Sequence, residues 1–155
     1  MKVHLNQIPP EGLHVEGTDP AEILDLQEET IRAVSEVRYS LDIGLSDGGL
    51  FATGTIGVDL ELECVKCLER FPYPVEVSDF ACQLDLTGAE LVDLTEYLRE
   101  DIVLALPPHP HCDWSGERVC KGNARVAAIH EAATDPLPQE REVWGALDQL
   151  KIKKT

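Results

Sequence analysis

The sequence has little positive charge and few aromatic side chains, and both shortages bear on function. Its 155 residues contain 13 Lys and Arg against 29 Asp and Glu, for a formal net charge of −16 at pH 7. Nucleic-acid binding usually depends on Lys and Arg that neutralise phosphates, so extensive wrapping of RNA or DNA is disfavoured. Aromatic residues make up 5% of the chain and are scattered, so no base-stacking platform is expected. The acidic charge either serves solubility alone or favours encounter with a basic protein.

Long apolar runs are also missing. The longest uninterrupted apolar stretches span only a few residues, so no segment is expected to cross a bilayer. Residues 1–10 lack the apolar core and the small-residue cleavage site of a secretory signal. We therefore expect a cytoplasmic protein without a membrane partner.

Recognisable catalytic motifs are absent from the sequence as well. It contains no Ser/His/Asp order, glycine-rich phosphate loop or HExxH-type helix. Acidic residues are abundant, but nothing singles out a catalytic pair among them. We expect a protein that is not an enzyme, with no small-molecule substrate evident.

A long hairpin over residues 37–63 is the clearest structural pattern. Apolar and polar side chains alternate from Val37 to Leu45 and again from Leu50 to Cys64, as expected for half-buried strands. Ser46-Asp47-Gly48-Gly49 between them supplies turn chemistry. Residues 71–86 are expected to form a further strand, since their two prolines do not suit a helix interior.

A helix is predicted over residues 94–106. Asp93 is its expected cap, Pro107-Pro108 ends it, and apolar residues recur every four positions at Leu94, Leu98, Ile102 and Leu106. Nearer the N-terminus, short strands are predicted at 2–8 and 13–16, with a short helix or turn after Asp19-Pro20. These elements predict an α+β domain in which the helix packs across an antiparallel sheet.

We assign residues 1–134 to this single domain and residues 135–155 to a linker, a short C-terminal helix and a basic tail. The helix is indicated by apolar residues on one side, namely Val143, Trp144, Leu147 and Leu150. The tail contains Lys151, Lys153 and Lys154, the one basic feature of the chain. These lysines are candidates for contact with RNA or a partner, or with the domain's own surface.

The strongest chemical signal is a set of four cysteines. Cys64-Val65-Lys66-Cys67 has the Cys-x2-Cys spacing of a zinc half-site, and Cys112 with Cys120 can complete four tetrahedral ligands. An odd total of five cysteines in a reducing compartment favours metal or free thiols over disulfides. We therefore predict a structural Zn²⁺ clasp between the two halves of the domain.

Alternatives to this ligand set stay open. Seven residues separate Cys112 from Cys120, more than is usual, so His109 or His111 could replace either later ligand. The four cysteines could also cluster as reduced thiols. A redox dithiol at Cys64 and Cys67 is disfavoured, because such motifs open a helix in a βαβ unit. Cys82 lies at an apolar strand position and is expected in the core.

The chain resembles the YceD family, also described as DUF177, in the same order over most of residues 35–151. The residues that carry the resemblance are 58–71 around Cys64-Val65-Lys66-Cys67, the segments 90–94 and 99–107, Cys112, Cys120-Lys121-Gly122, and 144–151 beginning Trp144-Gly145-Ala146-Leu147. The resemblance implies a role in the accumulation or processing of large-subunit (23S) ribosomal RNA, and a zinc site at the cysteine pairs. The chain departs from the pattern in its longer Cys112–Cys120 gap and in lacking the further cysteines of some relatives.

Charge, the family resemblance and the cysteine motif lead to three hypotheses. In the first, a non-enzymatic ribosome-biogenesis factor uses its acidic body to hold a basic large-subunit ribosomal protein, while the tail contacts rRNA. In the second, the protein binds large-subunit rRNA directly through a local basic face. In the third, Cys64 and Cys67 serve thiol redox chemistry or metal handling, which requires a lowered thiol pKa.

Overall fold

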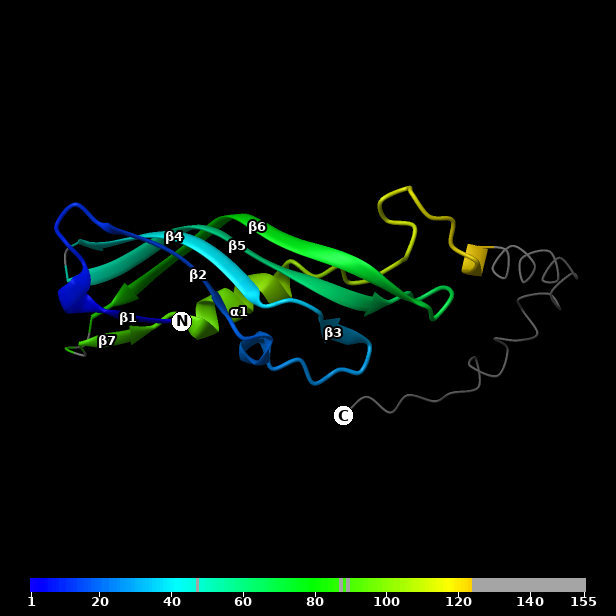
Figure 1. Ribbon diagram of the computed structural model, residues 1–155, viewed down its shortest axis with the longest axis horizontal. Coiled ribbons are helices and arrows are strands. Elements are labelled where there is room, and N and C mark those ends of the chain that lie inside the picture. The colour runs from blue at the N-terminus through cyan, green and yellow to red at the C-terminus, as the bar shows by residue number, and fades with distance from the viewer. Residues whose placement is uncertain (47, 87, 89, 124–155) are drawn as a thin grey trace, which may run out of the picture.

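The structure is a computed structural model that describes residues 1–46, 48–86, 88 and 90–123. A long, twisted antiparallel sheet runs through the described part of the chain (Figure 1). Its strands are β2 (Leu13–Asp19), β3 (Ile31–Ala33), β4 (Val37–Ser46), β5 (Gly49–Glu63) and β6 (Arg70–Asp85).

Strand β5 is the centre of this sheet. It has 15 residues, which corresponds to a length of about 50 Å for an extended strand. Residues 49–57 of β5 pair with β4 and residues 60–62 pair with β3, whereas β6 follows the opposite edge from 49 to 63. The predicted hairpin over 37–63 and the predicted strand over 71–86 are therefore confirmed.

The two prolines of β6 are compatible with its place at the edge of the sheet. Pro72 lies opposite Glu61 and Pro74 lies opposite Asp59 in the register with β5. Proline has no N–H to donate to a ladder, so it is tolerated where that position of the backbone faces away from the neighbouring strand. Strand β6 pairs with β5 alone among the described strands, which leaves its other edge free for these positions.

A bulge divides the β5–β6 ladder into two parts. Gly54 pairs with Phe80 and Ile56 pairs with Val77, so β6 spans three residues where β5 spans two. The extra residue changes which positions of β6 face the core, from Phe71 and Val75 before the bulge to Phe80 after it. A Cβ at Gly54 would lie 2.1 Å from the carbonyl oxygen of Ser40, so only glycine fits here.

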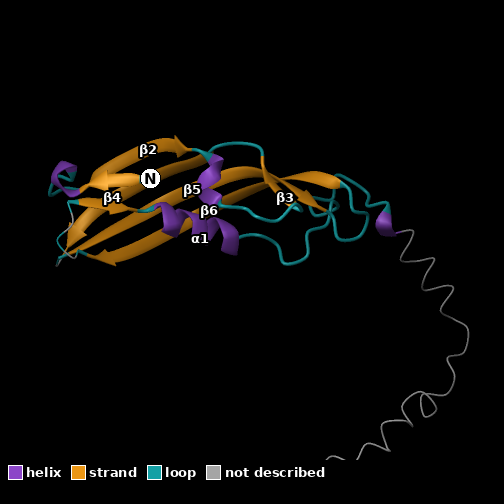
Figure 2. Cartoon of the chain, turned by 90° about the horizontal axis from the view of Figure 1, so that it is seen from below, coloured by secondary structure: helices purple, strands orange, loops and turns teal. Residues whose placement is uncertain are grey.

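Helix α1 (Thr95–Leu104) lies across β5 and β6 on one face of the sheet (Figure 2). Leu94, Leu98 and Ile102 are buried and Leu106 is partly buried, as the four-residue spacing predicts. The helix is shorter than the predicted 94–106. The Asp93 carboxylate accepts the N–H of Thr95 at 3.0 Å, one residue before the position that the helix geometry assigns to the cap.

The N-terminal region forms more varied structure than the sequence predicts. Strand β1 (Lys2–His4) pairs with β7 (Leu91–Asp93), and a 3-10 turn follows at Leu5–Gln7, so the predicted strand over 2–8 is too long. Strand β2 is longer than the predicted 13–16 because it pairs with β4 over seven positions. A 3-10 turn at Ala21–Leu24 follows Asp19-Pro20, in agreement with the predicted helix or turn.

No helix in the described part of the chain is both long and apolar enough to cross a membrane. The predicted linker, C-terminal helix and basic tail over 135–155 lie outside the described residues. The same is true of Lys151, Lys153 and Lys154, so their proposed contacts stay predictions.

Candidate metal centre

The Cys-x2-Cys motif occupies the tight turn between β5 and β6. Cys64 directly follows β5, and its N–H donates to the carbonyl of Glu69 at 3.0 Å. The N–H of Leu68 donates back to the carbonyl of Cys64 at 2.8 Å. These two backbone hydrogen bonds close the turn, and they place Leu68 in the left-handed region at φ 60°.

The second cysteine pair comes from the segment that follows α1, and this segment packs directly on the turn. The N–H of Val65 donates to the carbonyl of Pro110 at 2.9 Å. Gly122 is buried against Lys66, where a Cβ would lie 2.6 Å from the Lys66 carbonyl carbon and oxygen. Two parts of the chain more than forty residues apart are thus joined on both sides of the cysteines.

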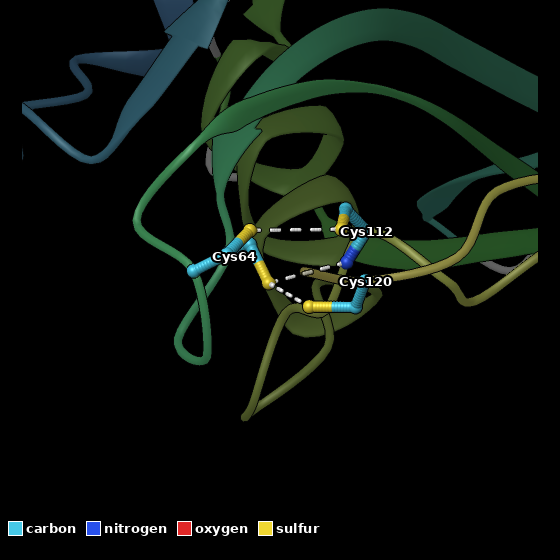
Figure 3. A group of neighbouring side chains, drawn as sticks. Cys64, Cys112 and Cys120 are labelled. Carbon is cyan, nitrogen blue, oxygen red and sulfur yellow. Dashed lines mark hydrogen bonds between the residues drawn. The ribbon is translucent and has the colours of Figure 1, made fainter. Parts of the chain in front are cut away.

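The four sulfurs form a compact group. Cys64 Sγ lies 3.8 Å from Cys120 Sγ, and Cys67 Sγ lies 3.7 Å from Cys112 Sγ. All four Sγ atoms lie within 4.8 Å of one another. Figure 3 shows Cys64, Cys112 and Cys120 converging from opposite sides of the group. A tetrahedral Zn–S bond of about 2.3 Å implies sulfur–sulfur separations of about 3.8 Å, so the arrangement fits a metal ion with four thiolate ligands.

Backbone donors favour the thiolate form at one of these positions. Burial alone would raise the pKa of the Cys64 thiol, but the N–H groups of Cys67, Cys112 and Lys66 lower this pKa to about 6. The Cys112 N–H lies 3.4 Å from Cys64 Sγ. For Cys112 itself, burial followed by the neighbouring sulfurs raises the pKa to about 12. The Cys64 thiol therefore ionises readily, whereas the Cys112 thiol needs a nearby cation to ionise.

Charged side chains connect the two segments around the cysteines. Glu69 accepts from Arg118 at 2.7 Å and from Lys121 at 2.8 Å, and Lys66 lies 3.6 Å from Asp113. Lys121, followed by Arg118, lowers the pKa of the Glu69 carboxyl. Each exposed ion pair contributes little to stability. Here, however, the Glu69 carboxylate alone joins the 64–69 turn to both Arg118 and Lys121.

The seven residues between Cys112 and Cys120 fold back on the sheet. Trp114 packs edge-on against Tyr73 of β6, with ring centroids 4.8 Å apart. The N–H of Trp114 donates to the His111 carbonyl, and that of Gly116 donates to the Asp113 carbonyl, both at 3.2 Å. The wide spacing between the two cysteines is therefore accommodated by local turns and by an aromatic contact.

The structure brings together the four cysteines that the sequence singles out: Cys64, Cys67, Cys112 and Cys120. His109 and His111 are not in this group; instead, His111 Nδ1 lies 3.1 Å from the His109 carbonyl. Cys82 is partly buried against the core, away from the other four. The sequence did not predict the close contact of Gly122 with Lys66 or the ion pairs of Glu69 with Arg118 and Lys121. Gly122 lies two residues after Cys120, and Glu69 lies two residues after Cys67.

Comparison of the chain with known protein families, with curated proteins and with solved structures found no match. The resemblance to the YceD family therefore stays a prediction.

Proposed function

We propose that Cys64, Cys67, Cys112 and Cys120 hold a structural zinc ion. The sulfur separations of 3.7 and 3.8 Å and the N–H donors around Cys64 support this assignment. Four thiolates fill a tetrahedral zinc site and leave no open position for water or substrate, which is typical of structural rather than catalytic zinc. Bound here, the ion would fasten the end of β5 to the segment that follows α1.

We propose further that the protein is a non-enzymatic factor in ribosome biogenesis. In this proposal it binds a basic large-subunit ribosomal protein and so supports accumulation of large-subunit (23S) rRNA. The ribosomal role is what the resemblance to the YceD family implies, and the observation that supports a basic partner is the distribution of charge. Residues 1–123 contain 24 Asp and Glu against 8 Lys and Arg, so this part of the chain holds the whole formal charge of −16.

A domain with this charge favours a basic protein over phosphate as its direct partner. Complementary charge speeds encounter and suppresses wrong partners, and the attraction weakens as salt screens it. A structural zinc site gives such a domain a fixed surface without a disulfide. In this proposal, any contact with rRNA is made by the basic C-terminal residues Lys151, Lys153 and Lys154, which lie outside the acidic residues 1–123.

Binding assays with purified small basic proteins of the large subunit test this function. We expect micromolar or tighter binding at low salt, weakened at least tenfold in 0.5 M salt. In cells, depletion of the protein is expected to lower 23S rRNA relative to small-subunit rRNA. Failure to bind any of these proteins at low salt, with unchanged rRNA after depletion, would contradict the proposal.

The lowered pKa of Cys64 also favours a second candidate, a thiol redox protein. Redox dithiols need the low-pKa sulfur to be accessible. Here Cys64 is fully buried, whereas in the more accessible Cys67 the pKa is raised. For Cys67, the largest single effect is the backbone donor at Glu69, which lowers the pKa, but burial and the neighbouring Cys64 and Cys120 sulfurs together outweigh it. Turnover of a dithiol substrate by the metal-free protein would establish this alternative in place of the first.

A further inference from the structure

An apolar groove lies directly beside the cysteine cluster. Its volume is about 430 Å³. Ile31 and Leu62 form one part of its lining, and Val65 and Leu68 form a second. The third part comes from the segment after α1 and consists of Leu106, Pro107, Pro108 and Pro110. Glu28 and Glu63 line the same groove. Among the residues that the structure describes, it is therefore an apolar cleft lined by acidic groups and by no Lys or Arg.

Two features of the turn at 64–69 lower the stability of the folded protein. Val65 and Leu68 are 53% and 66% exposed although both side chains are apolar. Leu68 also holds a left-handed backbone at φ 60°, which is strained for a residue with a side chain. A glycine or asparagine would suit this position better. Strained backbone and exposed apolar surface at one place are typical of a binding site.

The cysteine cluster holds the walls of this groove in position. Val65 lies between the two ligands of the first pair, and its N–H bonds the carbonyl of Pro110 in the opposite wall. Leu62 is two residues before Cys64, and Pro110 is two residues before Cys112. A metal that fixes the sulfurs therefore also fixes the distance between the walls.

We propose that this groove binds the apolar side of a basic amphipathic segment in a partner protein. The inference rests on the proposed function, because it places the contact with the basic partner at a defined site. Apolar side chains of the segment enter the groove, and its Lys and Arg meet Glu28 and Glu63. Phosphate is excluded by the same carboxylates, and a second copy of the chain brings its own charge of −16.

The first test measures binding of a defined probe to the full-length, zinc-loaded protein. The probe is a 16-residue peptide of Leu and Lys with all leucines on one helical face, and its control has the same composition in scrambled order. We expect the amphipathic peptide to bind at least tenfold more tightly than the scrambled one. Val65→Ser and Leu68→Ser should each weaken its binding at least tenfold.

Val119→Ser is the matched control, because Val119 is 85% exposed but lies outside the groove. This variant should bind the peptide as the wild type does. Circular dichroism and metal content verify that each variant is folded, and Leu68→Gly provides a second groove variant that relieves the backbone. Equal binding of the two peptides, or equal losses at Val65, Leu68 and Val119, would overturn the proposal.

Two further outcomes would assign the groove to other occupants and would also overturn it. Tighter peptide binding by Trp144→Ala would show that the chain's own residues 143–154 compete for the groove. A concentration-dependent dimer that Leu68→Ser abolishes would show that a second copy fills it.

Different results would contradict the groove proposal and the proposed function. If the ribosomal protein binds the wild type and the groove variants equally, the groove is wrong and the function stands. If the peptide binds in the groove but no ribosomal protein binds, the function is wrong and the groove stands.

Discussion

Gly122 lies so close to Lys66 that the backbones of the two cysteine segments touch. A Cβ at position 122 would be 2.6 Å from the carbonyl carbon and oxygen of Lys66 and 2.7 Å from its Cβ. No real Cβ occupies such a position, so a side chain here must push the two segments apart. The contact is two residues from Cys120 and one from Cys67, and any displacement reaches the sulfurs directly.

Gly122→Ala should therefore destabilise the zinc-loaded protein by about 1–3 kcal/mol, as expected for overpacking a close contact. Urea unfolding of the metal-loaded protein measures the change. Lys121→Ala is the control, because it removes only an exposed ion pair with Glu69 and should cost less than about 1 kcal/mol. Equal losses in the two variants would show that the backbones do not meet at Gly122.

Leu68→Gly should have the opposite effect on stability. Glycine relieves the left-handed strain at φ 60° but increases the entropy of the unfolded chain, so a net gain of about 0.5–1 kcal/mol is expected. Val65→Gly should destabilise the protein, because Val65 is not among the positive-φ residues. Thermal unfolding compares the two. A loss of stability in Leu68→Gly would mean that the leucine side chain supports the turn.

The imidazole of His14 should titrate above its ordinary range. Its ring nitrogens lie 2.8 Å from the Asp42 carboxylate and 3.2 Å from the Glu16 carboxylate, and the hydrogen bond to Asp42 is the main cause of the raised pKa. NMR titration of the ring measures this pKa directly. Asp42→Asn should lower it toward the ordinary value, and an unchanged pKa would contradict the contact.

The same contact predicts a pH dependence of stability. Because the folded-state pKa of His14 is raised, its contribution is fully present below the unfolded-state pKa of about 6.5 and is lost as pH rises through the folded-state value. His14→Gln should therefore differ in stability from the wild type mainly at acidic pH. A difference that grows with increasing pH would contradict the assignment.

The sequence predicts local features of this fold well. The hairpin at 37–63 follows from strict alternation with a turn signal, and the buried face of α1 follows from its four-residue spacing. The Cys64–Cys67 half of the cysteine cluster could be predicted because Cys-x2-Cys is a characteristic spacing of metal ligands. Each of these signals lies within a short stretch of chain.

Features that depend on distant contacts could not be predicted. Strand β1 pairs with β7 about ninety residues away, and Val3 alone gives no sign of Val92 as its partner. The bulge opposite Gly54 and the contact at Gly122 depend on which backbones come together, and a glycine in a sequence does not name its neighbour. The groove joins residues from three separate regions for the same reason.

Metal content of the purified protein tests the central claim most directly. Elemental analysis of wild type, Cys64→Ser and Cys82→Ser, purified with reductant and without chelator, should give one zinc per chain in the wild type and in Cys82→Ser. Cys64→Ser should lose the zinc, together with folded structure measured by circular dichroism. A metal-free wild type under these conditions, or full zinc retention in Cys64→Ser, would contradict the account.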